Sequence, residues 1–354
     1  MGLPKRALGL TTLEITTLGL GTWALGGGNW AFSWGPQDDA VSIQTMRHAI
    51  ELGVNWIDTA AGYGLGHSEE IVGRFLRDLS PSERPFVFTK CGLLWNENRP
   101  NEPARRVLRP ETIRQECEAS LRRLGVERID LYQFHWPDEM GTRVEDSWAT
   151  MSQLISEGKV HLAGVCNFSV ELLERCEPIQ HVDSLQPPFS LIRREAAERE
   201  IPWCARQKTG VICYSPMQSG ILTDSFSLER IAKMSPEDWR RRSEQFQQPK
   251  LGRNIALRDA LRPVAARHRA SVSDVAIAWT LSWPGVTGAI VGARSPEQVD
   301  GWIQAASLEL APADLDEIAV AIERTGAGAG PTSPASTAQN APSSDARGPR
   351  KARA

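Results

Sequence analysis

The stretches PFVFTK (residues 85–90), RPETIRQECEASLRRLG (109–125) and RIDLYQFHW (128–136) decide the fold. The first and the last are short apolar runs bounded by polar residues, which predicts two buried strands. The middle stretch opens its apolar stripe at Pro110 and ends at Gly125, which predicts an amphipathic helix. A strand, a helix and a second strand in this order indicate a parallel β-sheet.

The same alternation runs along most of the chain. The predicted strands are 17–20, 54–58, 86–90, 129–135, 160–166, 184–186, 211–214 and 288–291. Eight strands, nearly all separated by helices, favour an α/β fold closed into a (β/α)8 TIM barrel. An open doubly wound sheet is the alternative. Residues 7–15, with a turn at 9–12, are expected to form an N-terminal β-hairpin that caps the bottom of the barrel.

The length of 354 residues suits one barrel of about 250 residues with additions. We expect residues 1–324 to form the barrel and 325–354 to form a disordered tail. The tail is rich in Gly, Ala, Pro and Ser, so it buries too little surface to offset its ordering entropy. Residues 224–253 form a polar stretch with few core residues, and helices are predicted near 255–268 and 271–283.

Composition excludes several classes of function. Hydrophobic residues make up 41% and charged residues 23% of the chain, with a formal net charge of −3. This balance is typical of a soluble globular protein and gives no electrostatic reason to expect nucleic acid or a membrane surface as partner. The six cysteines form no CxxC pair, which argues against a zinc ribbon or a disulfide scaffold. We therefore expect a cytoplasmic enzyme with reduced thiols.

Polar residues recur where the apolar runs end. They are Asp58, Lys90, His135, Asn167, Gln186 and Tyr214, together with the segments 21–23 and 292–294. The active site of a barrel lies at the carboxyl ends of its strands, so these side chains are expected to meet there. Tyr63 follows Asp58 in a glycine-containing loop and is expected at the same end.

Asp58, Tyr63, Lys90 and His135 together suit proton donation to a carbonyl oxygen. An ammonium beside the phenol is expected to lower the pKa of Tyr63 by about 1–3 units, because it favours the phenolate. A carboxylate keeps the lysine charged and fixes its position. The histidine helps to hold the substrate oxygen against the tyrosine hydroxyl.

Two other readings of these residues lead to different chemistry. Lys90 could form a Schiff base, as lysine does in some aldolases, but the accompanying Tyr63 favours hydride transfer. His135 has no second histidine or suitably spaced carboxylate near it, so we expect no metal site.

The runs Asn55–Gly64, Phe88–Cys91 and Leu131–Asp138 resemble signature segments of the aldo-keto reductase superfamily. The resemblance covers about residues 7–323. It implies a (β/α)8 barrel and the reversible, NAD(P)H-dependent reduction of an aldehyde or ketone. Tyr63 would be the general acid, Lys90 and Asp58 would tune it, and His135 would orient the carbonyl group.

The resemblance also implies the cofactor site. The matching positions are Gly21, Thr22, Trp23, Asp58, Asn167, Gln186, Tyr214, Ser215, Met217, Ser219, Gly220, Gly292, Arg294, Ser295 and Gln298. Arg294 beside a serine suits a 2′-phosphate, so NADP(H) is the expected cofactor. The chain departs from the family pattern at Cys166, usually a serine, and at Gly301 and Trp302, where Glu-Asn is common.

Aromatic residues in the loops are expected to form the substrate wall. The predicted substrate-binding residues are Trp30, Trp34, Trp95 and Trp136. The expected partner is a small carbonyl or alcohol substrate. The sequence predicts no particular oligomeric state. A cofactor-sensing barrel subunit with little turnover is the alternative function, because such subunits can keep all four catalytic residues.

Overall fold

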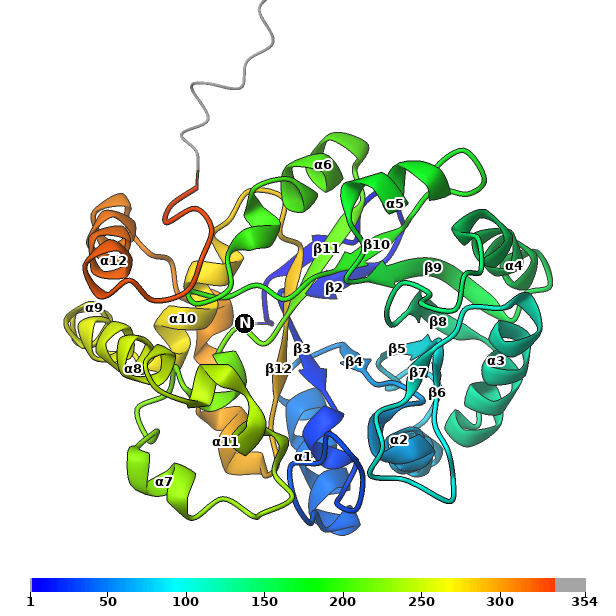
Figure 1. Cartoon of the computed structure of the whole chain (residues 1–354), viewed down its shortest axis with the longest axis horizontal. Helices are drawn as coiled ribbons and strands as arrows, with labels where there is room; N and C mark the ends of the chain where they lie inside the picture. The colour runs from blue at the N-terminus through cyan, green and yellow to red at the C-terminus, as the bar shows by residue number, and fades with distance from the viewer. Residues whose placement is uncertain (1, 335–354) are drawn as a thin grey trace, which may run out of the picture.

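The computed structural model describes residues 2–334, and eight parallel strands in it close into one barrel (Figure 1). The strands are β3 (Leu18–Gly21), β4 (Trp56–Asp58), β5 (Phe86–Cys91), β8 (Ile129–Phe134), β9 (Val160–Cys166), β10 (Ser184–Gln186), β11 (Gly210–Tyr214) and β12 (Gly288–Gly292). They follow one another around the barrel in chain order, and β12 pairs with β3 to close it. The predicted barrel is confirmed, and the open sheet is excluded.

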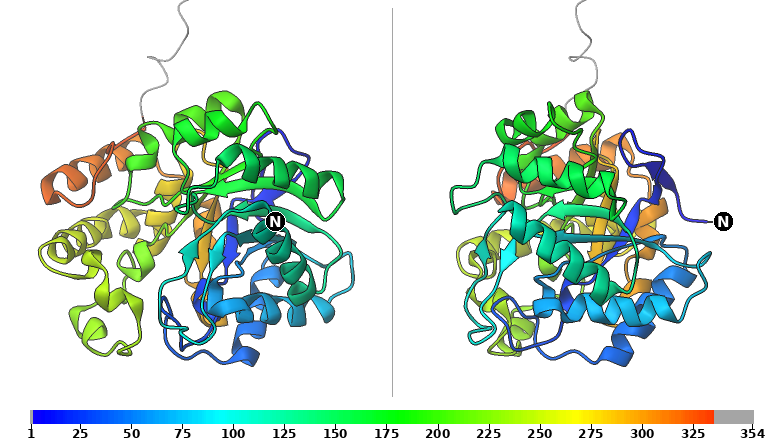
Figure 2. Two further views of the ribbon diagram at one scale, coloured as in Figure 1. Left: turned by 45° about the vertical axis from the view of Figure 1, so that its right-hand side comes forward. Right: turned by 90° about the vertical axis from the view of Figure 1, so that its right-hand side faces the viewer.

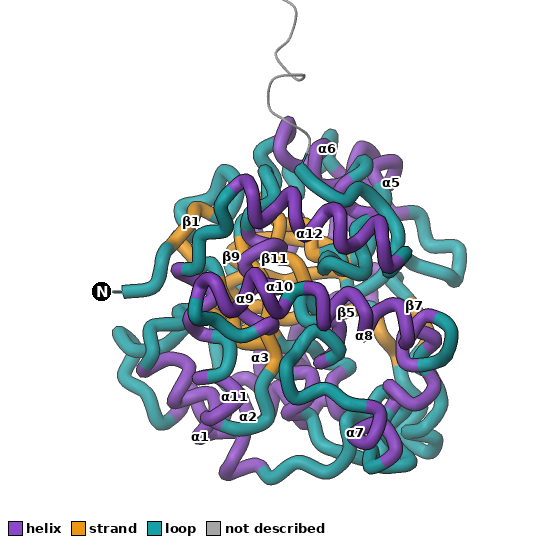
Figure 3. Tube along the Cα trace, turned by 90° about the vertical axis from the view of Figure 1, so that its left-hand side faces the viewer, coloured by secondary structure: helices purple, strands orange, loops and turns teal. Residues whose placement is uncertain are grey.

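Helices surround the strands on the outside, and side chains of the strands fill the interior of the barrel. They are α1 (Asp39–Glu51), α2 (His67–Arg77), α3 (Pro110–Leu124), α4 (Val144–Ser156), α5 (Val170–Cys176), α6 (Glu200–Gln207), α7 (Leu228–Ala232), α8 (Lys250–Ala260), α9 (Arg262–His268), α10 (Val272–Leu281), α11 (Pro296–Asp300) and α12 (Pro312–Thr325). On the side shown in Figure 3, α8, α9, α10 and α12 pack in front of the strands.

Local sequence signals explain where helices begin and end. Asp38 caps α1 by accepting a hydrogen bond from the Val41 backbone N–H over 2.9 Å. Pro110 opens α3 as predicted. The single helix expected at 255–268 is instead two, α8 and α9, because Pro263 disfavours a continuous helix through the residues before it.

The amino-terminal end of the barrel is closed by packed side chains. β1 (Lys5–Ala7) and β2 (Glu14–Thr16) pair antiparallel, which confirms the predicted hairpin. Figure 2 shows this dark-blue segment at the opposite end of the molecule from α7. Leu8 in its turn packs in one cluster with Trp56 and Phe88, whose ring centroids lie 5.1 Å apart inside the barrel. Loops are therefore free to build a site only at the other end.

The segment after α12 is ordered where composition indicated disorder. Residues 326–330 lie against the loop that follows β10, where the Arg194 guanidinium donates to the Ala327 carbonyl over 3.1 Å and to the Gly330 carbonyl over 3.2 Å. The Arg194 backbone N–H also donates to the carbonyl of Ala329 over 3.0 Å. Hydrogen bonds to its backbone carbonyls hold this segment, so it needs no large apolar side chain. Residues 335–354 of the predicted tail lie outside the described residues.

Among residues 2–334, no helix combines the length and the apolar character that a membrane crossing requires.

One further pair of short strands lies beside the barrel mouth. β6 (Leu93–Leu94) and β7 (Arg105–Arg106) run antiparallel and carry the loop between β5 and α3.

Candidate active site

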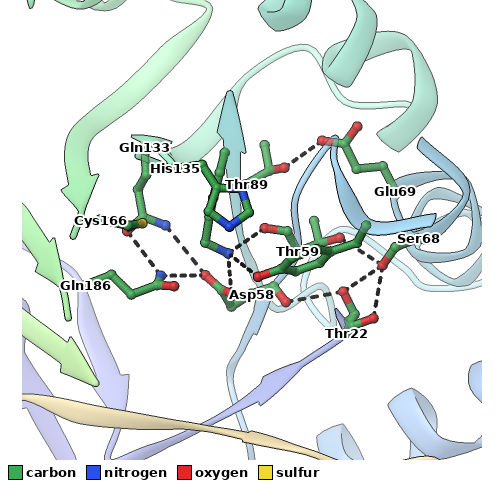
Figure 4. A network of polar contacts seen from close by, with 12 residues as sticks. Thr22, Asp58, Thr59, Ser68, Glu69, Thr89, Gln133, His135, Cys166 and Gln186 are labelled. Atoms are coloured by element: carbon green, nitrogen blue, oxygen red, sulfur yellow. Dashed lines mark hydrogen bonds and ion pairs between the residues drawn. The ribbon is translucent and has the colours of Figure 1, made fainter. Parts of the chain in front are cut away.

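Three predicted catalytic side chains meet at the ends of β4 and β5. The buried Lys90 ammonium donates to Asp58 Oδ1 over 2.5 Å and to the Tyr63 hydroxyl oxygen over 3.2 Å (Figure 4). The Thr59 carbonyl accepts a third bond from Lys90 over 2.8 Å. The three N–H donors of Lys90 are therefore all used, in hydrogen bonds to a carboxylate, a carbonyl and a phenol.

Tyr63 lies on a short 3-10 turn, Tyr63–Gly66, between β4 and α2. The next residue, Gly64, has φ = 59°, and a Cβ at that position would lie 2.0 Å from the Gly26 carbonyl oxygen. Only glycine fits this close approach, so the loop carrying Tyr63 packs directly on the loop after β3. His135 completes the group, with its ring centroid 5.5 Å from that of Tyr63 at an interplanar angle of 78°.

The electrostatics of the site differ from the sequence prediction at one residue. Burial raises the pKa of Tyr63, and this outweighs the lowering effect of the Lys90 charge. The predicted lowering of that pKa is therefore wrong for the ligand-free protein, and Tyr63 holds its proton firmly. Burial, followed by the charges of Lys90 and Arg106, holds the pKa of His135 well below its usual range. His135 is therefore a neutral imidazole at pH 7.

Two buried amides flank Asp58 on the side away from Lys90. Gln186 Nε2 donates to Asp58 Oδ2 over 2.9 Å, and Gln133 Nε2 lies 3.5 Å from the same oxygen. Asn167 accepts from the Tyr214 hydroxyl over 2.9 Å and donates to the His135 carbonyl over 3.0 Å. Hydrogen bonds thus connect the catalytic group directly to the residues expected near the nicotinamide.

A cavity of about 1250 Å³ opens over these residues. The predicted cofactor residues that line it are Gly21, Trp23, Asp58, Asn167, Gln186, Tyr214, Ser215, Met217, Ser219, Gly220, Gly292, Arg294 and Gln298. Thr22 lies behind the wall, where its hydroxyl lies 2.8 Å from the hydroxyl of Ser68. Ser295 is not among the lining residues either; it stands at the N-cap position of α11 without a capping hydrogen bond from its side chain. Lys90 lies beneath Tyr63, outside the lining.

The far end of the cavity suits a ligand that carries phosphates. Its lining includes the cations Arg230, Arg240, Lys250, Arg253 and Arg294, of which Arg240 pairs with Asp238 and Lys250 pairs with Glu244. The backbone has positive φ at Ser215, Gln218 and Ser219 in the turn after β11. Such strain in non-glycine residues is typical of ligand-binding turns. The donor set therefore fits the pyrophosphate and phosphate groups of a dinucleotide.

Arg294 is already engaged within the protein. Its guanidinium donates to the Gln37 side-chain oxygen over 2.9 Å, to the Trp34 carbonyl over 3.1 Å and to the Pro36 carbonyl. Arg294 thereby connects the strand end of β12 to the loop after β3. A phosphate at Arg294 would have to share the guanidinium with these carbonyls.

Three of the four predicted substrate-side tryptophans line the cavity. They are Trp30, Trp34 and Trp136. Trp95 is not among the lining residues. Trp34 has a second role, because the Arg240 guanidinium carbon lies 4.3 Å from its ring centroid and its edge meets the ring of Trp23. It therefore packs the loops together as well as facing the cavity.

Several lining residues have no counterpart in the sequence prediction. Trp239 stacks on Trp23 with ring centroids 5.0 Å apart, although it lies in the polar stretch 224–253. A tryptophan in an otherwise polar segment was the only available signal. Arg106 covers the ring of Trp136 at 4.2 Å, and Gly328 lines the cavity from the C-terminal segment.

No group of three or more histidine, cysteine, aspartate or glutamate side chains in the described part of the chain is placed to hold a metal ion.

Comparison with known proteins gives consistent matches over most of the chain. The model of the Aldo/keto reductase family matches residues 17–323. The aldo-keto reductase YhdN of Bacillus subtilis (strain 168) is 34% identical over 316 residues, which cover 89% of this chain and 92% of that protein. The NADH-specific methylglyoxal reductase of Escherichia coli (strain K12) is 33% identical over 332 residues, covering 90% of this chain and 99% of the relative.

A solved structure agrees in both fold and sequence. The glycerol dehydrogenase AKR11B4 from Gluconobacter oxydans superimposes with a TM-score of 0.81 at 34% identity, covering 91% of this chain and 95% of that one. Identity at this level over nearly the whole length is more than a shared barrel would give. The chain therefore belongs to the aldo/keto reductase family, whose members interconvert carbonyl compounds and alcohols with a nicotinamide cofactor.

Proposed function

We propose that this chain is an NADP(H)-preferring carbonyl reductase in which Tyr63 donates the proton. The observation that carries the proposal is the contact of Lys90 with both Asp58 and Tyr63 at the floor of the cavity. A lysine held there by a carboxylate has no packing role that a smaller apolar residue could not fill. It places a fixed positive charge beside the phenol of Tyr63, which faces the cavity next to His135.

The bound cofactor would supply a hydride to the carbonyl carbon. Tyr63 would give its proton to the carbonyl oxygen as negative charge develops there. Lys90 would stabilise the resulting phenolate, because its ammonium lies 3.2 Å from the phenol oxygen. The neutral imidazole of His135 would donate a hydrogen bond to the same carbonyl oxygen and orient it. Asp58 would keep Lys90 charged throughout.

The cofactor would be held by the lining residues named above. Asn167 and Gln186 present amides near the catalytic group, while Tyr214 offers a ring face beside them. The preference for NADP(H) rests on Arg294, because a guanidinium binds a phosphate through paired charge-assisted bonds. One relative is named as NADH-specific, so both cofactors belong in the test.

The substrate would lie between the catalytic group and the aromatic loops. Trp30 and Trp136 form apolar walls, with His135 between the cavity and β8. We also propose a reducing compartment such as the cytoplasm, because all six cysteines are buried free thiols.

Titration of the purified protein with NADPH and with NADH tests this function. Trp23 lines the cavity, so its fluorescence should fall on binding. Saturable binding with a clear preference for NADPH, followed by turnover of simple aldehydes, is the expected result. A preference for NADH would overturn the role of Arg294 while leaving the reductase. A folded protein that binds neither cofactor would overturn the proposed function.

A further inference from the structure

Gln133 is a buried side chain to which the proposed chemistry gives no role. Successive side chains of a strand point to opposite faces, so Leu131, Gln133 and His135 share one face of the β8 segment and Tyr132 lies on the other. Leu131 packs in the cluster inside the barrel. Gln133 therefore faces the interior between Leu131 and His135, and it is fully buried. A polar amide at this depth requires hydrogen-bond partners, because leaving it unpaired is costly.

The partners of Gln133 all belong to the catalytic or the expected nicotinamide site. Its Nε2 lies 3.5 Å from Asp58 Oδ2. Its Oε1 accepts from Gln186 Nε2 over 3.2 Å and from the Cys166 thiol over 3.8 Å (Figure 4). Gln133 thus connects Asp58, Gln186 and Cys166 in one small network.

This network fixes which way the Gln186 amide faces. An ionised carboxylate only accepts hydrogen bonds, so the N–H2 groups of both glutamines must face Asp58. Gln186 Nε2 then donates one hydrogen to Asp58 over 2.9 Å and the other to Gln133 Oε1 over 3.2 Å. Both of its donors are used. Among the described residues, no donor reaches Gln186 Oε1, and Gln186 lines the cavity.

We propose that Gln133 is a positioning residue that presents Gln186 Oε1 to the carboxamide N–H2 of the nicotinamide. The inference rests on the nicotinamide position proposed above. Without an acceptor at Gln133, one Gln186 hydrogen loses its partner, and a single hydrogen bond to Asp58 is left to hold the amide, whose plane is then free to rotate about that bond. Gln186 Oε1 would then no longer be aimed at the carboxamide N–H2, and the hydrogen bond between them would weaken.

A cofactor analogue separates this role from general damage. In the 3-acetylpyridine analogue, a methyl group replaces the amide N–H2, so Gln186 Oε1 has nothing to accept. The wild-type protein should therefore bind the reduced parent cofactor more tightly than the reduced analogue. The variant Gln133→Met keeps the length of the side chain but lacks the acceptor. Its preference for the parent cofactor should fall by about fivefold to tenfold, the usual effect of one hydrogen bond.

The experiment measures equilibrium binding of parent and analogue by fluorescence, and turnover with each. Tyr132→Phe is the matched control, because Tyr132 is the neighbouring residue of β8 and packs in the outer core. It should leave the binding ratio unchanged. In Gln133→Met, the KM for the parent cofactor should rise more than kcat falls, since the Lys90 contact with Tyr63 does not involve Gln133.

The inference fails if Gln133→Met weakens parent and analogue equally, because that would indicate lost packing alone. If that variant does not fold, Gln133→Leu provides the same ratio with a shorter apolar side chain. A wild-type protein that binds the parent cofactor without discriminating against the analogue also overturns the inference, while the proposed function stands. A wild-type protein that binds neither ligand overturns the proposed function, and this inference with it.

Discussion

The Lys90 ammonium lies 3.2 Å from the Tyr63 hydroxyl oxygen and 4.9 Å from the centre of the same ring. The cation therefore approaches both the atom proposed to lose the proton and the electron-rich ring attached to it. Its attraction for the phenolate exceeds its attraction for the phenol. The benefit is largest after the proton has left, which is the state that catalysis must stabilise.

Replacing Tyr63 with phenylalanine should remove turnover and leave cofactor binding in place. The loss of a positioned general acid should lower kcat by about 100-fold to 10,000-fold. The Kd of the cofactor should change little, because the phenol oxygen contacts Lys90 rather than the expected cofactor residues. Stopped-flow turnover and fluorescence titration check the two parts. A Tyr63→Phe enzyme that keeps most of its kcat would refute the proton-donor role.

Replacing Arg294 with alanine should weaken NADPH binding selectively. The loss of hydrogen bonds to a charged group should lower NADPH affinity by about 10-fold to 100-fold, with a much smaller effect on NADH. Gln37→Ala is the control, since Gln37 holds the same loop by bonding Arg294 while the guanidinium remains. Its ratio of NADPH to NADH affinity should match the wild type. Equal losses for both cofactors in Arg294→Ala would mean that Arg294 only anchors the loop.

Glu116 should make stability depend on pH. Burial raises the pKa of this carboxyl from 4.5 to about 7, and its Oε2 accepts from the Gly92 backbone N–H over 3.0 Å. The folded state thus binds the proton more tightly than the unfolded state. The contribution of this group to stability is full below about pH 4.5 and is lost as the pH rises through about 7.

The variant Glu116→Gln cannot ionise, so its stability relative to wild type should rise across that pH range. At about 1.4 kcal/mol per pH unit, the change should be on the order of 3 kcal/mol. Urea unfolding at several pH values measures it. Glu118→Gln is the control, because Glu118 is a half-exposed residue of the same helix paired with Lys159. Parallel stability curves for Glu116→Gln and wild type would contradict the prediction.

Replacing Gly328 with alanine should detach the C-terminal segment from the cavity. Gly328 has φ = 67°, and a Cβ there would lie 1.9 Å from the Ile192 carbonyl oxygen. We expect a loss of about 1–3 kcal/mol in stability and a higher KM for the carbonyl substrate, because the added Cβ would push Gly328 and Ala329, which line the cavity, away from the Ile192 carbonyl.

Gly326→Ala is a closely matched control for that substitution. Gly326 has φ = 62°, yet a Cβ there would meet nothing within 4 Å. It should cost only the backbone strain of about 1 kcal/mol and leave the KM unchanged. Thermal unfolding and steady-state kinetics compare the two variants. Identical effects would show that the segment does not shape the substrate site.

The barrel and the places of the four residues proposed as catalytic could be predicted because each depends on a short stretch of sequence. Apolar runs fix the strands, and the residue after each run must lie at the mouth, as Asp58 and Lys90 do. The bounds of β10 (Ser184–Gln186) agree with the prediction, since Asp183 precedes the strand and Pro187, which has no backbone N–H, follows it. No knowledge of distant contacts is needed for these inferences.

The remaining features depend on contacts between distant segments. Trp239 stacks on Trp23 across the mouth, and no periodic pattern encodes that contact. Arg194 holds Ala327 through a backbone carbonyl, which leaves no trace in composition. The direction of the Tyr63 pKa shift could not be read either. It depends on how deeply the phenol is buried, and burial is a property of the assembled loops.

Trp56 and Phe88 fill the barrel beneath the catalytic group, and Leu8 covers them from below. Packed side chains therefore close this end of the barrel, and the cavity opens at the other end. In the proposed mechanism, the proton that Tyr63 delivers in one turnover would be replaced from solvent through the same mouth that admits the substrate. Product departure and reprotonation share one route. Slow release of a bulky alcohol product would consequently delay the reprotonation of Tyr63 as well as the departure of the product.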